Sequence, residues 1–273
     1  MARPVGKQLL RSSIALLRQD PRVLWLPLIG AALSLLGFGL LVGGSAWLTN
    51  VDNRSPAFEV AGILAATFIG TGVTAFTSVA VATAATSRMD GVTPAVGASL
   101  SKAWQRRRLI IEWTVLAFGV GTVLRLVERR LGGVGGGIFS IVGSLAWGVA
   151  TFLVVPILAF EDVGPIQAVK RSSRLIEQHF GTVGRGALRF GFVFVGWGLA
   201  AAAIILVGLV LILGGRTLGF PIVVVGVLAL FLIIEVAIAV GVYLRTILYR
   251  FTTGQPLPDL GLELSKAFGG DAP

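Results

Sequence analysis

The sequence contains no cysteine and only one histidine, His179, in its 273 residues. Disulfide bonds, thiolate metal sites and iron–sulfur clusters are therefore excluded. Because His179 lies in a polar segment without a second imidazole, we interpret it as an interfacial side chain rather than a zinc ligand. Paired acids at catalytic spacing are also missing from any one polar segment. We accordingly expect no metal, no cofactor and no enzymatic activity.

Charged residues are scarce too. They make up 13% of the chain, whereas hydrophobic residues make up 55%, and an average soluble domain has about 25% charged residues. This composition is typical of integral membrane proteins. A helix that crosses the hydrocarbon core needs about 20 mainly apolar residues. The runs of that length are Val23–Leu48, Ala57–Ser87, Leu109–Val127, Ile138–Phe160, Phe190–Leu213 and Leu218–Leu244.

These runs predict an all-α polytopic bundle of six transmembrane helices. They are too long for barrel strands and lack the alternation of apolar and polar residues that such strands need. The first run is longer than the core of a secretory signal, so we interpret it as a retained anchor. The polar connections are too short to fold separately, which predicts a single membrane domain over residues 1–273.

The net charge of +10 raises the question of nucleic-acid binding, and the placement of the 23 basic residues argues against it. Eighteen of them fall on one predicted face, which includes both termini. The positive-inside rule then predicts a plasma-membrane protein with cytoplasmic N- and C-termini. Contact with anionic head groups accounts for the charge without nucleic acid. The other face has Arg54, Arg125, Arg129, Arg130 and Arg216.

One cationic phrase occurs twice, as PAVGASLSKAW at Pro94–Trp104 and as PDLGLELSKAF at Pro258–Phe268. Similar segments lie at Val5–Pro21 and Gly164–Gly181. Each predicts an amphipathic helix that lies in the membrane interface on the cytoplasmic side. In the third segment the predicted apolar stripe consists of Ile166, Val169, Ile176 and Phe180.

These segments divide the chain into three parallel pseudo-repeats, each an interfacial helix followed by two spans. The approximate bounds are 3–91, 92–162 and 163–251, with a C-terminal interfacial half-repeat at 252–273. Successive units contain an even number of spans, so they have the same orientation in the membrane.

The passage Trp147–Gly181, with Pro156, Glu161, Gly164, Pro165, Ala168 and Arg171-Ser172, carries a family resemblance, as does LYRFTTGQPLP at Leu248–Pro258. It resembles the signature of prokaryotic six-span integral membrane proteins of unknown function. These distantly resemble the membrane domain attached to some glycerophosphodiester phosphodiesterases. The resemblance implies an integral membrane protein without a settled activity, and the phosphodiesterase catalytic domain is absent from this sequence.

Glu235 is the acidic residue nearest the middle of a predicted span. An ionised carboxylate at that depth costs about 2.5 to 3.5 kcal/mol on insertion scales, so it should be protonated, paired or facing a wet cavity. Two interpretations stay open. Glu235 is a proton or cation site, or it makes one hydrogen bond to a neighbouring helix.

The second polar candidate follows the fourth span. Glu161 precedes a predicted helix that starts at Pro165, and negative charge favours a helix N-terminus. A pair between Arg171 and an acid at this elbow would fix the interfacial helix. The alternative is recognition of a lipid head group by Lys170, Arg171 and Arg174.

The second span carries small residues at a strict four-residue interval, which predicts close helix packing and a central place in the bundle. A polar pore lined by Thr67, Thr71, Thr74 and Ser78 is the alternative. The packing stripe includes Gly62, Ala66, Gly70, Thr74, Ser78 and Ala82.

Two further local features carry predictions about backbone. The glycine-rich Gly132–Gly137 lacks the strand and the Lys-Ser/Thr of a phosphate-binding loop, so it predicts a flexible outer turn. Pro156 predicts a kink in the fourth span.

Two functional hypotheses follow. The first is a non-enzymatic integral membrane module that organises lipid or holds a partner membrane protein, including a second copy of itself. The second is a small-molecule, ion or lipid transporter with its route between the repeats, using Glu235 and the threonines of the second span.

Overall fold

The computed structural model describes residues 5–52, 57–178 and 180–256, and no strand occurs among them. His179 and the second copy of the repeated phrase lie outside the described residues. Six helical segments are long and apolar enough to cross a membrane, so the chain is an all-α, multi-pass membrane protein. These segments are α2 (Trp25–Asp52, preceded by a 3₁₀ turn at Pro21–Leu24), α3 (Ala57–Met89), α5 (Arg107–Leu131), α6 (Gly133–Ala150) with α7 (Val154–Phe160), α9 (Phe180–Leu213), and α10 (Gly219–Thr252).

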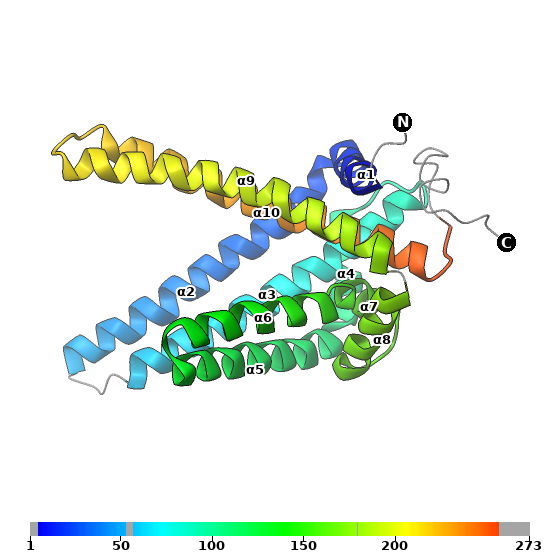
Figure 1. Cartoon of the computed structure of the whole chain (residues 1–273), viewed down its shortest axis with the longest axis horizontal. Helices are drawn as coiled ribbons and strands as arrows, with labels where there is room; N and C mark the ends of the chain where they lie inside the picture. The colour runs from blue at the N-terminus through cyan, green and yellow to red at the C-terminus, as the bar shows by residue number, and fades with distance from the viewer. Residues whose placement is uncertain (1–4, 53–56, 179, 257–273) are drawn as a thin grey trace.

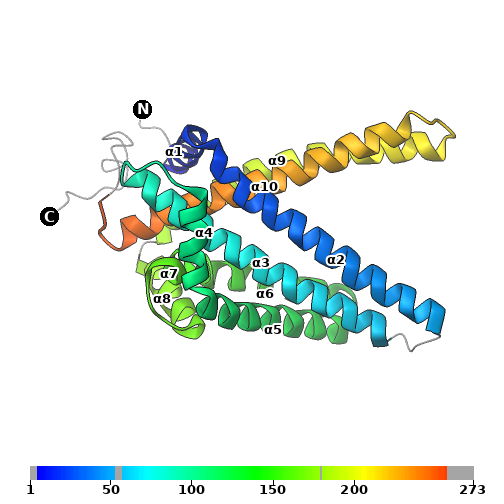
Figure 2. The same ribbon diagram turned by 180° about the vertical axis from the view of Figure 1, so that it is seen from behind.

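Three shorter helices, α1 (Val5–Gln19), α4 (Val96–Gln105) and α8 (Pro165–Gln178), each precede a pair of long segments. They gather near the end of the molecule that carries both chain termini (Figures 1 and 2). The long helices leave large apolar side chains uncovered, with Leu40 76% and Leu213 88% exposed. So many exposed apolar side chains on long helices indicate that lipid acyl chains surround them.

The long helices form two arms that meet at the termini end and diverge away from it (Figure 1). One arm is the α9–α10 hairpin, and the other contains α2, α3, α5 and α6. The buried core lies where the arms meet, and its largest fully buried side chains include Tyr243, Leu153 and Ile157. α3 is central and contacts α1, α2, α4, α5, α7 and α10.

The small-residue stripe of α3 does not form one continuous contact. A Cβ atom at Gly62 would lie 2.9 Å from Leu41 O of α2 and collide with it, whereas a Cβ atom at Gly70 would have no neighbour within 4 Å. Four residues advance an α-helix by about 400°, so a strict four-residue track turns by about 40° per step and meets successive neighbours. Thr74 is exposed. The buried members are Ala66, Ser78 and Ala82.

The fourth span is interrupted rather than kinked. α6 ends at Ala150, residues 151–153 form turns, and α7 begins at Val154. Pro156 cannot donate a hydrogen bond to the carbonyl four residues earlier, and its ring displaces that turn of helix. The freed N–H of Leu153 donates to Ser172 Oγ at 3.1 Å, so α8 supplies the missing acceptor.

The prediction of a flexible turn over Gly132–Gly137 was wrong. α5 ends at Leu131 and α6 begins at Gly133, so Gly132 alone connects them, with a φ of 61° that favours glycine. Gly133, the first residue of α6, also has a positive φ of 47°, and residues 134–137 lie within the helix. The two helices touch there. A Cβ atom at Gly136 would lie 2.5 Å from Glu128 O.

The apolar stripe predicted for α8 differs from its buried face. Ile166 is 60% exposed, while Ala168 and Ser172 are fully buried and Leu175 and Ile176 nearly so. The reason is that α8 packs against α5, α6, α7 and α9. Its small residues face the protein, which periodicity by itself did not indicate.

Candidate functional site

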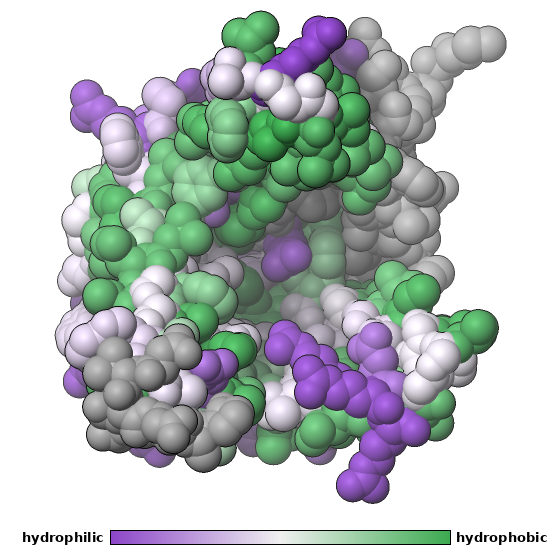
Figure 3. Space-filling view, turned by 90° about the vertical axis from the view of Figure 1, so that its left-hand side faces the viewer, coloured by the Kyte–Doolittle hydropathy of each residue, from purple (hydrophilic) through white to green (hydrophobic). Residues whose placement is uncertain are grey.

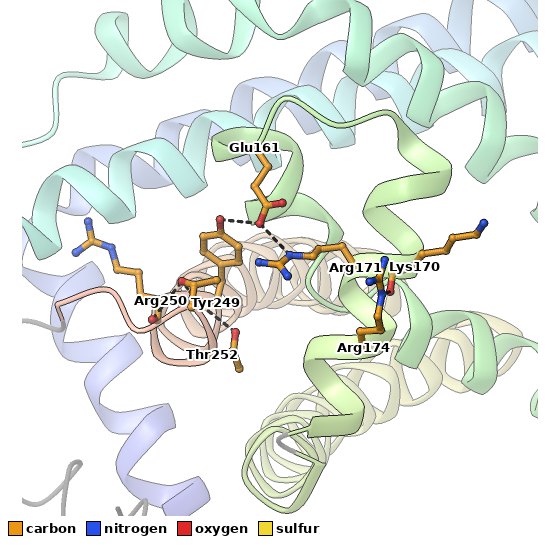
Figure 4. Close-up of polar contacts among 8 residues, drawn as sticks. Glu161, Lys170, Arg171, Arg174, Tyr249, Arg250 and Thr252 are labelled. Carbon is orange, nitrogen blue, oxygen red and sulfur yellow. Dashed lines mark hydrogen bonds and ion pairs between the residues drawn. The ribbon is translucent and has the colours of Figure 1, made fainter. Parts of the chain in front are cut away.

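Glu161 links three helices at the termini end (Figure 4). α7 ends at Phe160, and the extended backbone of Glu161 follows. Tyr249 Oη of α10 donates to Glu161 Oε1 at 3.0 Å, and Arg171 Nε of α8 lies 3.4 Å from the same oxygen. Tyr249 is 3% exposed, and its ring stacks on Phe160 with centroids 5.9 Å apart. The carboxylate therefore ties α8 and α10 to the end of α7.

Other ion pairs surround this elbow. Arg106 Nη1 lies 3.1 Å from Asp162 Oδ1 and also donates to Glu161 O at 3.3 Å, which connects α5 to the α7–α8 linker. Arg250 of α10, which is 5% exposed, pairs with Asp90 at 2.6 Å. These contacts brace the convergence of the two arms.

Lys170 and Arg174 do not join this network. Both are exposed on α8, and neither forms an ion pair with any described residue. Arg174 Nε lies 3.4 Å from the carbonyl oxygen of Lys170, and the Lys170 side chain points away from Glu161 (Figure 4). Of the three predicted head-group cations, Arg171 is thus engaged in the protein and the other two are available to a ligand.

Glu235 lies at the middle of α10 and is 6% exposed. It makes no hydrogen bond or ion pair with any residue in the described part of the chain. It does not line the cleft between α3 and the α9–α10 hairpin.

A cleft of about 540 Å³ separates α3 from the α9–α10 hairpin. The space-filling view shows the molecule hollowed at its centre, with polar surface inside the hollow (Figure 3). Most of the lining is apolar, and the polar side chains in it are Thr74, Ser78 and Arg245. Thr67 and Thr71 are absent from this lining, and their hydroxyl groups donate to Ile63 O and Thr67 O within α3.

Arg245 is the charged residue of the cleft. Its Nε is buried without a hydrogen-bond partner, and Arg245 makes no ion pair with any described residue. Its guanidinium carbon lies 5.2 Å from the centroid of the Phe152 ring. The described residues hold no group of three or more His, Cys, Asp or Glu side chains that could bind a metal ion.

In the sequence the sixth apolar run ends at Leu244, so Arg245 is one of the eighteen basic residues on the face predicted to be cytoplasmic. In the structure α10 continues to Thr252, which leaves Arg245 about 10 Å inside the helix at 1.5 Å per residue. Helical spacing could have indicated this position from the sequence, since Arg245 lies on the same face of α10 as Leu230, Ala237 and Gly241.

Comparison with known proteins gives a family and no activity. A search of curated proteins found no match. A family model described as a family of unknown function matches residues 61–255, which run from the first turns of α3 to just past α10 and thus include both the Glu161 elbow and the cleft. The chain belongs to this family, DUF6159.

Proposed function

We propose that the protein is a non-enzymatic integral membrane module that organises anionic lipid at the cytoplasmic face of the plasma membrane. The observation that carries the proposal is the pair of unpaired, exposed cations on α8, Lys170 and Arg174, on a helix that Glu161 and Ser172 fix in place. A helix that is already fixed presents its cations to phosphates without the cost of ordering its backbone on binding.

The proposed orientation follows from the charge distribution. Basic residues concentrate at the end that carries α1, α4 and α8, and this end is cytoplasmic by the positive-inside rule. The order of one short helix and two long segments, repeated three times, supports the three parallel pseudo-repeats. In each unit the short helix then lies at the same interface.

A second role within this proposal is to hold a partner membrane protein or another copy of the chain. Exposed apolar side chains on α2 and α9 would form the contact within the bilayer. Crosslinking in cells from exposed positions on these helices should then capture one reproducible partner.

Lipid organisation is tested in nanodiscs that contain phosphatidylglycerol and phosphatidylcholine. Each cation near an anionic surface contributes about 1 kcal/mol, so the double variant Lys170→Gln/Arg174→Gln should reduce phosphatidylglycerol enrichment around the protein. The matched control is Arg129→Gln/Arg130→Gln, an exposed pair at the opposite end of the molecule. An equal loss in both variants would contradict the proposal, because net charge alone would then explain it.

A transporter is the second candidate, and the cleft is the observation that favours it. Thr74 and Ser78 line the cleft and are polar, whereas Glu235 does not line it. Proteoliposomes should then show movement of a fluorescent lipid between leaflets that the double variant Thr74→Val/Ser78→Val slows. Identical rates with and without the protein would refute this candidate.

A further inference from the structure

We infer that the cleft between α3 and the α9–α10 hairpin binds one anionic phospholipid, with the lipid phosphate on Arg245 and one acyl chain along α10. The site belongs to the leaflet on the side of the chain termini. This inference rests on the membrane setting of the proposed function, and it does not depend on the cations of α8.

The positive charge of Arg245 in the cleft is not paired with an acidic group of the described residues. A guanidinium group has five N–H donors and no acceptor, yet Arg245 makes no hydrogen bond or ion pair with any described residue. The guanidinium carbon lies 5.2 Å from the centroid of the Phe152 ring, and Arg245 is among the residues that line the cleft. Arginine matches phosphate oxygens in a two-point arrangement, so a phosphate would satisfy donors that the protein leaves unpaired.

The length of the cleft fits an acyl chain. The lining residues of α10 run from Leu230 to Arg245 at spacings of three and four, which places them on one helix face. At 1.5 Å per residue this face is about 22 Å long. Half of a hydrocarbon core of about 30 Å is about 15 Å, so the face is long enough for one leaflet's acyl chain running from Arg245 toward Leu230.

The depth of Arg245 agrees with this assignment. Glu235 marks the middle of α10, and Arg245 lies ten residues, or about 15 Å, nearer the termini end. That distance from the bilayer centre is about where the hydrocarbon core ends and the head groups begin.

The walls explain why the occupant is a lipid rather than a soluble anion. Phe194, Ile233 and Ile234 line the part of the cleft away from Arg245, and Gly198 leaves space there, with no atom within 4 Å of a Cβ position. The outward side of the hairpin exposes Leu199 and Leu228, so acyl chains surround it. The volume of about 540 Å³ lies within the range of about 300 to 1,000 Å³ that is usual for ligand sites.

The test uses the full-length protein in mild detergent. Dioleoyl phosphatidylglycerol, dioleoyl phosphatidylcholine and inorganic phosphate are added separately to delipidated protein, and native mass spectrometry counts the bound lipid. The wild type should retain one phosphatidylglycerol molecule. Arg245→Gln should weaken that binding at least tenfold, because charge-assisted hydrogen bonds contribute about 1.5 to 3 kcal/mol, and Arg245→Lys should recover part of it.

Two further variants separate this site from folding defects and from general charge. Gly198→Leu fills the apolar part of the cleft without removing charge, and it should weaken phosphatidylglycerol binding with Arg245 intact. Arg108→Gln removes a cation outside the cleft, whose side chain is 89% exposed and pairs with Glu112, and it should bind as the wild type does.

Three results would overturn the inference. They are undiminished phosphatidylglycerol binding in Arg245→Gln, equal retention of phosphatidylcholine by the wild type, and binding of inorganic phosphate as tight as that of phosphatidylglycerol. The α8 variant Lys170→Gln/Arg174→Gln changes the surrounding lipid shell and leaves the single bound lipid in place. Failure of the proposed function and failure of this site are therefore distinguishable.

Discussion

Truncating Glu161 should loosen the junction of α7, α8 and α10. In Glu161→Ala the buried hydroxyl of Tyr249 loses its acceptor, and an unsatisfied buried polar group costs about 1 to 3 kcal/mol. The Arg171 pair contributes less, about 0 to 1 kcal/mol, because its side chains are 44% and 23% exposed and the distance is 3.4 Å. The expected loss is about 2 kcal/mol, mostly from the Tyr249 contact.

The measurement is thermal melting in detergent, followed by fluorescence-detected size exclusion. A loss of 1 kcal/mol lowers Tm by about 2 to 4 °C in domains of 150 to 250 residues, so Glu161→Ala should melt about 4 to 8 °C below the wild type. Glu161→Gln keeps an oxygen that accepts from Tyr249 and should lose less than half as much. Tyr249→Phe removes the donor and leaves the stacking on Phe160.

The double variant Glu161→Ala/Tyr249→Phe completes a thermodynamic cycle. Both partners of the hydrogen bond are then absent, so the double variant should be more stable than the sum of the two single losses predicts. Strict additivity, or equal melting of Glu161→Ala and Glu161→Gln, would refute the view that Glu161 acts through this buried contact.

Two other predictions concern packing and orientation. Gly219→Ala should lower Tm by several degrees, because the added Cβ atom would lie 2.5 Å from the backbone of α9 and overpacking costs about 1 to 3 kcal/mol. The control is Gly198→Ala, whose added Cβ atom would have no neighbour within 4 Å, and it should melt as the wild type does. The native chain has no cysteine, so Lys170→Cys and Arg216→Cys can each be labelled alone with a membrane-impermeant maleimide. In intact cells we expect labelling of position 216 only, and the reverse pattern would contradict cytoplasmic termini.

Hydrophobic length predicted the fold class, because about 20 apolar residues are needed to cross a bilayer and backbone groups there must be satisfied within helices. The short helices were predicted from amphipathic spacing: α1 and α8 lie within the segments that this spacing marked, and α4 ends one residue beyond its segment. The prediction that Arg171 pairs at the elbow matches the contact with Glu161. That pairing was accessible because a linker of a few residues brings the two side chains together.

Helix–helix contacts were less accessible to sequence reasoning. The strict stripe on α3 suggested one packed face, whereas that face turns from α2 to the cleft because four residues exceed one helical turn. Tyr249 was missed as the partner of Glu161, since 88 residues separate them and no local pattern connects them.

The amino-acid sequence by itself determined that this chain lies in a membrane and that it forms six long apolar helical segments, since both depend on local hydrophobicity and length. Only the tertiary structure decided which polar groups meet and which stay unpaired. Arg245 illustrates the difference. In the sequence it is a cation beside an apolar run and resembles an interfacial residue, whereas in the structure it lines the cleft between the two arms. The anion binding that we infer for Arg245 rests on the absence of a partner on α3, α9 or α10 among the described residues, and that absence is a property of packing.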